Sequence, residues 1–234
     1  MEFGICHLES LKNMCRFLLL KSKFKVNSQH IIEHFSDMAQ KSKALDGDWQ
    51  GDGWGISWLD ENNNWSIYTS VSPIWEETSH FARIPETSFL VIHARSASFP
   101  QDKNNIHYNQ PYLDDNYVFV FNGLLKGVTI PFQAEGKIGA QKTWFLLTKF
   151  LRNKSPEKAL RKLKELMIAN AKKIIALNIG LCDKKSIYVF TMYEKHPEYY
   201  RLQLHQSKDL IIVSSEAIQG YDFSGLANGI IKKF

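Results

Sequence analysis

The sequence predicts a layered α+β sandwich, in which two sheets lie between helical layers. The predicted elements follow the order strand, helix, strands, two helices, strands, so strands outnumber helices and two of the helices are adjacent. The segments 88–92 and 117–121 are almost continuously apolar, which is typical of strands covered on both faces. Because helices do not alternate regularly with strands, this order favours a layered α+β domain over a parallel α/β fold.

The first half of the chain contains one predicted helix between strands. The run CRFLLLK at 15–21 is a short apolar segment typical of a buried strand. An amphipathic helix is expected over 27–45, where apolar side chains recur on one side and Asn27 or Ser28 can serve as the N-cap. Its apolar side consists of Ile31, Ile32, Phe35, Met38 and Ala39. Further strands are expected at 53–59, 64–71, 88–98 and 117–125.

The second half of the chain begins with helices and ends in strands. Two helices are expected at about 139–153 and 156–172, and the pair Ser155-Pro156 suits an N-cap followed by a first helical residue. Two hairpins are expected at 172–194 and 199–218. The chain therefore ends in extended structure that can complete the two sheets.

Composition places the chain among globular proteins, with 44% hydrophobic residues, 23% charged residues and a net charge of +5. The longest apolar run near the N-terminus, Phe17–Leu20, is too short to cross a membrane or to form a signal-peptide core. The expected location is therefore the cytoplasm, without a membrane partner. Basic residues gather at 149–173, and we interpret them as a solvated helix face because no recognisable nucleic-acid motif accompanies them.

Cysteine is the first residue type that could carry chemistry. Cys6, Cys15 and Cys182 are odd in number and lack metal-ligand spacing, which argues against a disulfide framework and leaves room for a reactive thiol. A free N-terminal cysteine behind Met14 could use its own α-amine, with a reference pKa of about 7.7–8.0, as the base for its thiol. An internal cysteine on a buried strand would instead be an inert small hydrophobic residue. The residues alone leave both interpretations of Cys15 open.

Two further groups of polar residues lie at strand ends. Asn122-Gly123 offers a side-chain amide and a sterically free backbone N–H, which together could stabilise an oxyanion. The same pair is also common in ordinary turns. Arg95 stands among small residues in the run ARSAS, so its guanidinium has room for a bidentate carboxylate, with a surface salt bridge as the alternative.

Taken in order along the chain, several short segments resemble the class II glutamine amidotransferases, which belong to the N-terminal nucleophile hydrolases. The segments are MCRFLLLKS (14–22), DGWGISW (52–58), SPIW (72–75), VIHARSAS (91–98), VFVFNGLL (118–125) and IVSSEAI (212–218). Each segment is a weak signal alone, but their order and spacing make the resemblance specific. It extends from Met14 to about residue 218, which is nearly the whole chain.

This resemblance implies a four-layer αββα sandwich of the N-terminal nucleophile hydrolase type and an amidohydrolase activity. Cys15, as a free N-terminus, would attack the γ-amide of glutamine or of a γ-glutamyl compound and form a thioester. Asn122 and the backbone N–H of Gly123 would form the oxyanion hole. Arg95 would hold the α-carboxylate of the substrate, and Ser98 would line the same substrate site. Neither a metal nor an organic cofactor is implied, and the ammonia would pass to a separate synthase subunit or simply be released.

Two positions depart from the family pattern. Gln110 stands where the family has the histidine of its Asn-x-His-Pro segment, and Gln141, beside Lys142, stands where it has an aspartate that grips the α-ammonium. A neutral amide at Gln141 can still bind substrate through hydrogen bonds, but it loses the charge pairing. The change favours a γ-glutamyl compound with a blocked amine, or another small amide, over free glutamine. A binding or regulatory module that kept the fold and lost the activity is the alternative.

The N-terminal segment decides whether the thiol can be activated. No repeat or low-complexity linker divides the chain, so we expect a single domain at 14–234. We interpret residues 1–13 as a leader, a propeptide or a misassigned start. The resemblance then implies that the mature protein begins at Cys15.

Overall fold

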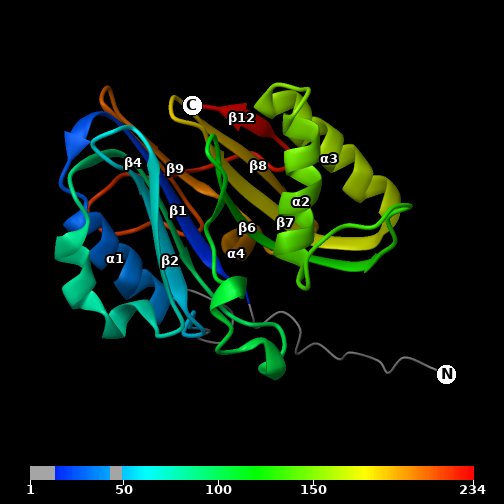
Figure 1. Ribbon diagram of the computed structural model, residues 1–234, viewed down its shortest axis with the longest axis horizontal. Helices are drawn as coiled ribbons and strands as arrows, with labels where there is room; N and C mark the ends of the chain where they lie inside the picture. Colours follow the sequence, from blue (N-terminus) through cyan, green and yellow to red (C-terminus); the bar gives the residue numbers. More distant parts are fainter. Residues whose placement is uncertain (1–13, 43–48) are drawn as a thin grey trace.

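Two antiparallel sheets stacked face to face form the centre of the computed structural model, which describes residues 14–42 and 49–234 (Figure 1). The helix α1 (Gln29–Gln40) covers the outer face of one sheet, and α2 (Gly139–Leu151) and α3 (Pro156–Asn170) cover the outer face of the other. The layers therefore follow the order helix, sheet, sheet, helix. The predicted αββα sandwich is confirmed.

The first sheet is built around the strand that follows the predicted nucleophile. Its strands are β1 (Arg16–Val26), β2 (Trp54–Leu59), β3 (Trp65–Ser70), β4 (Thr87–Ala94), β9 (Gln203–Gln206), β10 (Leu210–Ser214) and β11 (Ser224–Gly225). Their order across the sheet is β11-β9-β10-β1-β4-β2-β3. The start of β1 is therefore held on both sides, by β10 and by β4.

The second sheet has an open edge at one of its long strands. Its strands are β5 (Tyr112–Leu113), β6 (Val118–Val128), β7 (Ala171–Cys182), β8 (Ile187–Tyr193) and β12 (Ile231–Lys233), in the order β12-β8-β7-β6-β5. The short β5 pairs only with Val118 and Phe119 of β6. Beyond this pairing, the outer edge of β6 is not covered by another described strand.

Side-chain alternation separates three apolar layers. In β1, Leu18 packs toward α1, whereas Phe17 and Leu19 face the second sheet. In β6, Val120 faces the first sheet, whereas Phe121 packs toward α2 and α3. Because successive strand residues point to opposite faces, this pattern tells which side chains near the strand ends enter the layer between the sheets.

The structure shortens two predicted elements. The helix predicted over 27–45 is α1 at Gln29–Gln40, and the predicted positions 43–45 lie outside the described residues. The strand predicted over 88–98 ends at Ala94, so that residues 95–98 form a loop. Short 3₁₀ turns occupy Ile74–Glu76, Thr78–Arg83, Pro100–Asp102 and Ile106–Tyr108.

One predicted strand begins with a helix instead. Tyr199 and Tyr200, expected at the start of a strand, belong to the short helix α4 (Pro197–Tyr200). His196 adopts a left-handed conformation with φ 59, which turns the chain, and proline suits the first helical position that follows. Within the described ranges, no helix combines the length and apolar character that a membrane crossing requires.

Candidate active site between the two sheets

Cys15 lies immediately before β1, the central strand of the first sheet. Phe17 faces the second sheet, so alternation points Cys15, two residues earlier, into the layer between the sheets. The thiol is half-buried and donates a long hydrogen bond, with Sγ 3.7 Å from the carbonyl oxygen of Ser96. This places the predicted nucleophile at the rim of the layer between the sheets.

Met14, the residue before the predicted nucleophile, is buried, with 2% of its surface exposed. Its neighbours in one apolar cluster are Ala176, Tyr193, Tyr199 and Tyr200. In this form of the chain the nitrogen of Cys15 belongs to a peptide bond and cannot take a proton. An amine base at Cys15 therefore requires cleavage of the bond between Met14 and Cys15.

Arg16 anchors the start of β1 from the opposite face of the strand. Its Nε donates to a carboxylate oxygen of Glu216 at 2.6 Å, and its Nη2 donates to the Ser42 hydroxyl at 2.8 Å. The guanidinium also lies 4.4 Å from the centre of the Tyr199 ring. Burial lowers the pKa of Arg16, but the Glu216 carboxylate more than offsets this and raises it above its ordinary value. The ionised pair fixes the backbone next to Cys15.

No role was predicted for Arg16 or Glu216 from the sequence. Both lie in segments that carry the family resemblance, MCRFLLLKS and IVSSEAI, so the resemblance could have drawn attention to them. Their pairing joins residues far apart in the chain, because β1 and β10 are neighbours in the sheet.

Arg95 lies beside the predicted nucleophile. The register of β1 against β4 pairs Arg16 with Ala94, so the next residues outward, Cys15 and Arg95, are neighbours across the two strands. The side chain is buried, with 4% of the residue exposed. It is therefore not the partner of a surface salt bridge, which was the alternative interpretation.

The guanidinium of Arg95 is held by neutral groups. Its Nη2 donates to the carbonyl oxygen of Asp102 at 2.7 Å, its Nη1 donates to that of Asp52 at 3.4 Å, and it lies 5.6 Å from the centre of the Tyr108 ring. None of the ion pairs in the described part of the chain includes Arg95. A buried guanidinium without a carboxylate partner has its charge available for an anionic ligand.

Asn122 and Gly123 lie on β6, in the facing sheet. Asn122 is 3% exposed and points into the layer between the sheets, as Val120 does two residues earlier. A Cβ at Gly123 would lie 2.9 Å from the carbonyl oxygen of Ala176 and would also crowd the Phe121 ring. Glycine is therefore required at this position by the packing of the sheet.

Gln110 shows which edge of β6 the Gly123 N–H faces. The side-chain oxygen of Gln110 accepts from the Phe121 N–H at 2.6 Å, and its nitrogen donates to the Phe121 carbonyl at 3.1 Å. The backbone of Phe121 thus faces the open edge of β6, and alternate residues of a strand direct their N–H groups to the same edge. The Gly123 N–H therefore points to this open edge, next to the Asn122 amide.

The segment that carries Gln110 bridges the two sheets. Asn109 donates from Nδ2 to the carbonyl oxygen of Ser70 at 2.6 Å in the first sheet, whereas Gln110 pairs with the second sheet. A Cβ at Gly53, where φ is +109, would collide with Asn109, and one at Gly55 would collide with the backbone of Gln110. The two glycines of the DGWG segment thus let this bridge approach β2 closely.

His93 lies on β4, opposite Phe17 and facing the layer between the sheets, and is fully buried. Burial and the charge of Arg95 lower the pKa of His93 to about 3, and the nearby carbonyl of Phe121 only partly opposes this. The imidazole is therefore neutral near pH 7 and is a packed part of the site. It is not available as a cationic acid.

We expect His93 to make the fold sensitive to acid. Its pKa is about 3 in the folded protein and 6.5 as the reference value, so the unfolded chain binds more protons and stability falls as pH decreases from about 6.5 to about 3. At pH 5 this amounts to about 2 kcal/mol of unfolding free energy. Urea unfolding of the wild type and His93→Asn at pH 7.5 and pH 5 measures the difference. The His30 side chain is 87% exposed, so His30→Asn is the control and should lose as much unfolding free energy between pH 7.5 and pH 5 as the wild type. An equal loss in His93→Asn would contradict the assignment.

The other two predicted substrate residues lie on separate segments. Ser98 is exposed, in the loop after β4. The Gln141 side chain holds the start of α2: its oxygen accepts from the backbone N–H of Lys137 at 2.8 Å, and its nitrogen donates to the His107 carbonyl at 3.1 Å. The amide of Gln141 is thus engaged with backbone groups and fixes the turn before α2.

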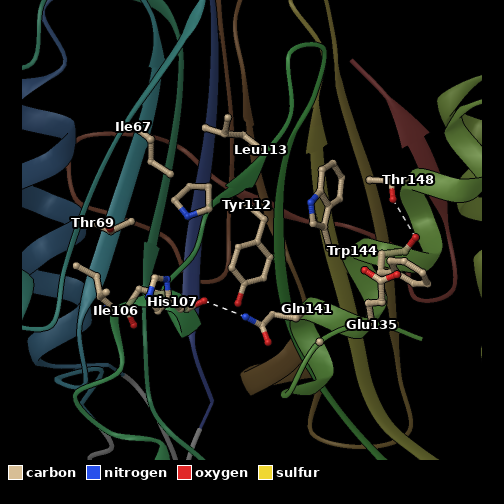
Figure 2. A pocket seen from close by; sticks show the side chains of 14 residues that line it. Ile67, Thr69, Ile106, His107, Tyr112, Leu113, Glu135, Gln141, Trp144 and Thr148 are labelled. Carbon is tan, nitrogen blue, oxygen red and sulfur yellow. Dashed lines mark hydrogen bonds between the residues drawn. The ribbon is translucent and has the colours of Figure 1, made fainter. Parts of the chain in front are cut away.

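A cleft of about 580 Å³ lies between β3 and α2. Figure 2 shows Ile67 and Thr69 of β3 on one side, Trp144 of α2 on the other, and Tyr112 between them. Gln141 also lines this cleft (Figure 2). The cleft was not predicted from the sequence, because it depends on how the loop before β5 packs between the sheets.

Tyr112 connects this cleft to the predicted site. Its hydroxyl donates to the carbonyl oxygen of Tyr108 at 3.2 Å, and the Tyr108 ring is the one next to Arg95. Burial raises the pKa of Tyr112, the charge of Arg95 lowers it, and a charged thiol at Cys15 raises it. The Tyr112 hydroxyl therefore lies within electrostatic reach of both residues.

The second described thiol does not resemble a nucleophile. Cys182 is fully buried, and burial together with Asp183 raises the pKa of its thiol above the ordinary value. Cys6 lies outside the described residues. Within 14–42 and 49–234, no group of three or more His, Cys, Asp or Glu side chains could hold a metal ion.

The sequence matches no protein-family model and no curated protein. Its fold is similar to that of a glutamine aminotransferase class-II domain protein from Silicibacter pomeroyi, with a TM-score of 0.60 and 14% identity over 94% of each chain. It is also similar to glutamine phosphoribosylpyrophosphate amidotransferase from B. subtilis, with a TM-score of 0.64 and 11% identity over 94% of this chain and 49% of that one.

A third solved structure, the allosteric regulatory enzyme of purine biosynthesis, gives a TM-score of 0.67 and 13% identity over 94% of this chain and 48% of its own. The chain thus spans about half the length of the last two proteins. At these identities the likeness shows the fold, which is that of the class II glutamine amidotransferase domain.

Proposed function

We propose that the protein is an amidohydrolase of the class II glutamine amidotransferase type, which hydrolyses a γ-amide through a thioester on an N-terminal Cys15. One observation supports the proposal: the groups that the chemistry needs lie on or directly beside β1, β4 and β6, strands whose alternate side chains enter the layer between the sheets. These groups are a half-buried thiol at Cys15, a buried guanidinium at Arg95 without a carboxylate partner, and two donors at Asn122 and Gly123.

In the proposed reaction, the α-amine of Cys15 takes the thiol proton and the sulfur attacks the γ-carbonyl carbon. The carbonyl oxygen becomes an oxyanion, which accepts hydrogen bonds from the Asn122 amide and the Gly123 N–H. The C–N bond then breaks, and the protonated amine returns its proton to the leaving nitrogen, which departs as ammonia. A water molecule deprotonated by the same amine attacks the thioester, releasing the carboxylic acid and restoring the thiol.

This mechanism requires residues 1–14 to be absent from the active form. We infer that residues 1–13 are a leader, a propeptide or a misassigned start of a single domain at 14–234, and that Met14 is removed as well. Cleavage after Met14 converts the nitrogen of Cys15 into an amine whose reference pKa is about 7.7–8.0, close to that of a useful base near neutral pH.

The hydrogen bonds of the Gln141 amide affect which substrate the site would prefer. Its oxygen and nitrogen already bond the backbone at Lys137 and His107, and an amide carries no charge to pair with an α-ammonium. This supports a γ-glutamyl compound with a blocked amine, or another small amide, over free glutamine. Released ammonia would go to a separate synthase subunit or to solvent.

A second candidate function is a binding or regulatory module with the same fold and no catalysis. The observation that favours it is the burial of Met14, which packs among Tyr193, Tyr199 and Tyr200 and leaves Cys15 without a free amine. In that form Arg95 could still bind a carboxylate. The two candidates differ in the N-terminus of the protein isolated from its own cell.

Intact-mass measurement of the natively expressed protein therefore tests the proposal. We expect a chain that begins at Cys15, and we expect a diazo-ketone analogue of glutamine to label Cys15 in that chain. The labelled peptide is identified by mass spectrometry, with the unfolded protein as the control for general thiol reactivity. A stable native species beginning at Met1, with no labelling while folded, would overturn the amidohydrolase and favour the binding module.

A further inference from the structure

Two tyrosines link the cleft between β3 and α2 to Arg95. The Tyr108 ring lies 5.6 Å from the Arg95 guanidinium, and the Tyr108 carbonyl accepts the hydroxyl proton of Tyr112, which lines the cleft. Under the proposed function, Arg95 holds the α-carboxylate, whereas Cys15 meets the γ-carbonyl. A group that leaves the α-carbon of the substrate would therefore pass Tyr112 and enter this cleft.

The walls of the cleft are largely apolar and aromatic. Figure 2 shows Ile67 and Ile106 facing it from one side and Trp144 from the other. The Trp144 ring is stacked on Phe119, with 5.2 Å between the ring centres and an interplanar angle of 26°, so the indole is held in a fixed position. The cleft has a volume of about 580 Å³ and is widely open to solvent, so a bound group would rest against these walls on one side. Such a space exceeds what an amino acid alone would occupy.

The charges around the cleft do not suit a free α-ammonium. Gln141, on the cleft wall, is neutral and bonded to the backbone. Among the described residues that line the cleft, Glu135 is the one carboxylate, and it is exposed to solvent on the loop before α2. Asp52, close to Arg95, is paired with Lys103 at 2.9 Å and accepts from the Ala97 N–H. An uncharged α-nitrogen fits these surroundings better than a charged one.

We propose that this cleft binds an apolar acyl group on the α-nitrogen of the substrate, so that the substrate class is glutamine N-acylated with an aromatic or large apolar group. A dipeptide that ends in glutamine belongs to the same class. This inference rests on the proposed function for the placement of the γ-amide, and it adds a specificity site for the rest of the molecule. Ile67, Ile106 and Trp144 contact the acyl group, and Arg95 keeps the free α-carboxylate.

Substrate comparison with the chain that begins at Cys15 tests the class. The probes are glutamine, N-acetylglutamine, N-phenylacetylglutamine and γ-glutamylanilide, and the readout is kcat/KM for release of ammonia or aniline. We expect N-phenylacetylglutamine to exceed N-acetylglutamine about tenfold to a hundredfold, the range expected for burying an aromatic ring. Equal or better turnover of free glutamine, or a preference for the ring on the leaving nitrogen, overturns the proposal.

Variants of exposed side chains locate the effect without endangering the fold. Ile67 and Ile106 are 43% and 44% exposed, and their replacement by Ser should lower the ratio of N-phenylacetylglutamine to N-acetylglutamine turnover at least fivefold. Ile168 on α3 is 52% exposed and lies away from the cleft, so Ile168→Ser is the matched control and should keep the wild-type ratio. An unchanged ratio in both cleft variants contradicts the assignment of this cleft.

A binding measurement separates this inference from the proposed function. Calorimetry with Cys15→Ala reports the affinity for N-phenylacetylglutamine and N-acetylglutamine without any turnover. Tighter binding of the phenylacetyl compound, lost in Ile106→Ser, supports the cleft even if the wild type hydrolyses no amide. Hydrolysis of all amides at similar rates, with equal affinities, would contradict the cleft assignment but not the proposed amidohydrolase activity.

Discussion

Replacing Cys15 by Ala in the chain that begins at residue 15 is expected to lower amide hydrolysis by about 10⁴-fold or more, with little change in stability. The substitution removes the sulfur that would form the thioester, and no other described side chain replaces it, since Cys182 is fully buried with a raised pKa. The backbone at position 15 keeps its anchor, because Arg16 remains bonded to Glu216 and Ser42. Ammonia release and thermal unfolding measure the two effects.

The matched control for this prediction is Cys182→Ala. It removes the other described thiol, in the apolar layer between the sheets, and is expected to cost stability through a small cavity while the active chain keeps its turnover. Residual hydrolysis within tenfold of the wild type in Cys15→Ala would show that a different group is the nucleophile.

Replacing Asn122 by Ala is expected to lower kcat by about 10²–10³-fold with little change in KM. The Asn122 amide is expected to stabilise the substrate oxygen mainly when this oxygen carries the negative charge of the tetrahedral intermediate. Removing the amide therefore raises the barrier without weakening substrate binding. The Gly123 N–H remains and retains part of the stabilisation. Steady-state kinetics with N-acetylglutamine and with the best substrate found separates kcat from KM.

Asn178 provides the control for Asn122. The two residues are directly opposite each other on β7 and β6, and Asn178 is 1% exposed, so both amides are buried in the same sheet face. Asn178, however, donates to the carbonyl oxygen of Tyr200 at 2.7 Å and is one strand further from the open edge. Asn178→Ala should therefore reduce stability and spare kcat. A similar fall of kcat in both variants would indicate a disturbed sheet instead of a lost oxyanion donor.

The layers of the fold could be predicted from the sequence because they follow from local patterns. The apolar runs of β4 and β6 are continuous over the segments covered on both faces, and α2 and α3 have the spacing of helices that cover one side of a sheet. The short helix at Tyr199–Tyr200 was predicted as strand, because the alternating residues after it continue the pattern of β9. The turn at His196 depends on its left-handed backbone, which no periodicity reveals.

The candidate site was predicted in part. Cys15, Arg95 and Asn122-Gly123 were singled out as strand-end residues with suitable chemistry, and the structure brings their strands to the same layer. The strand-end placement was wrong for Asn122-Gly123, because β6 continues to Val128 in its pairing with β7. The role of Gln110 could not be predicted. Its side-chain amide bonds the backbone N–H and carbonyl of Phe121, as a neighbouring strand would, and this contact forms only after both sheets are assembled.

The cleft could not be predicted for a similar reason. Its walls come from β3, the loop before β5 and α2, which are distant in the sequence, and Tyr112 and Trp144 look like ordinary core aromatics in their own segments. Ion pairing between Arg16 and Glu216 likewise joins the two ends of the chain. Each of these features needed the tertiary arrangement before its chemistry became visible.

If Cys15 becomes the N-terminus as proposed, the burial of Met14 imposes an order on maturation. With 2% of its surface exposed among three tyrosines, Met14 and the bond that follows it are sheltered once the sheets have assembled. A processing peptidase needs an extended, accessible segment, which the chain offers while it is still emerging or unfolded. Cleavage and folding therefore compete for the same nascent chain. Under the proposed function, a chain that folds before cleavage would lack activity until local opening exposes the bond, so the rate of N-terminal processing during synthesis would set how much active protein a cell obtains.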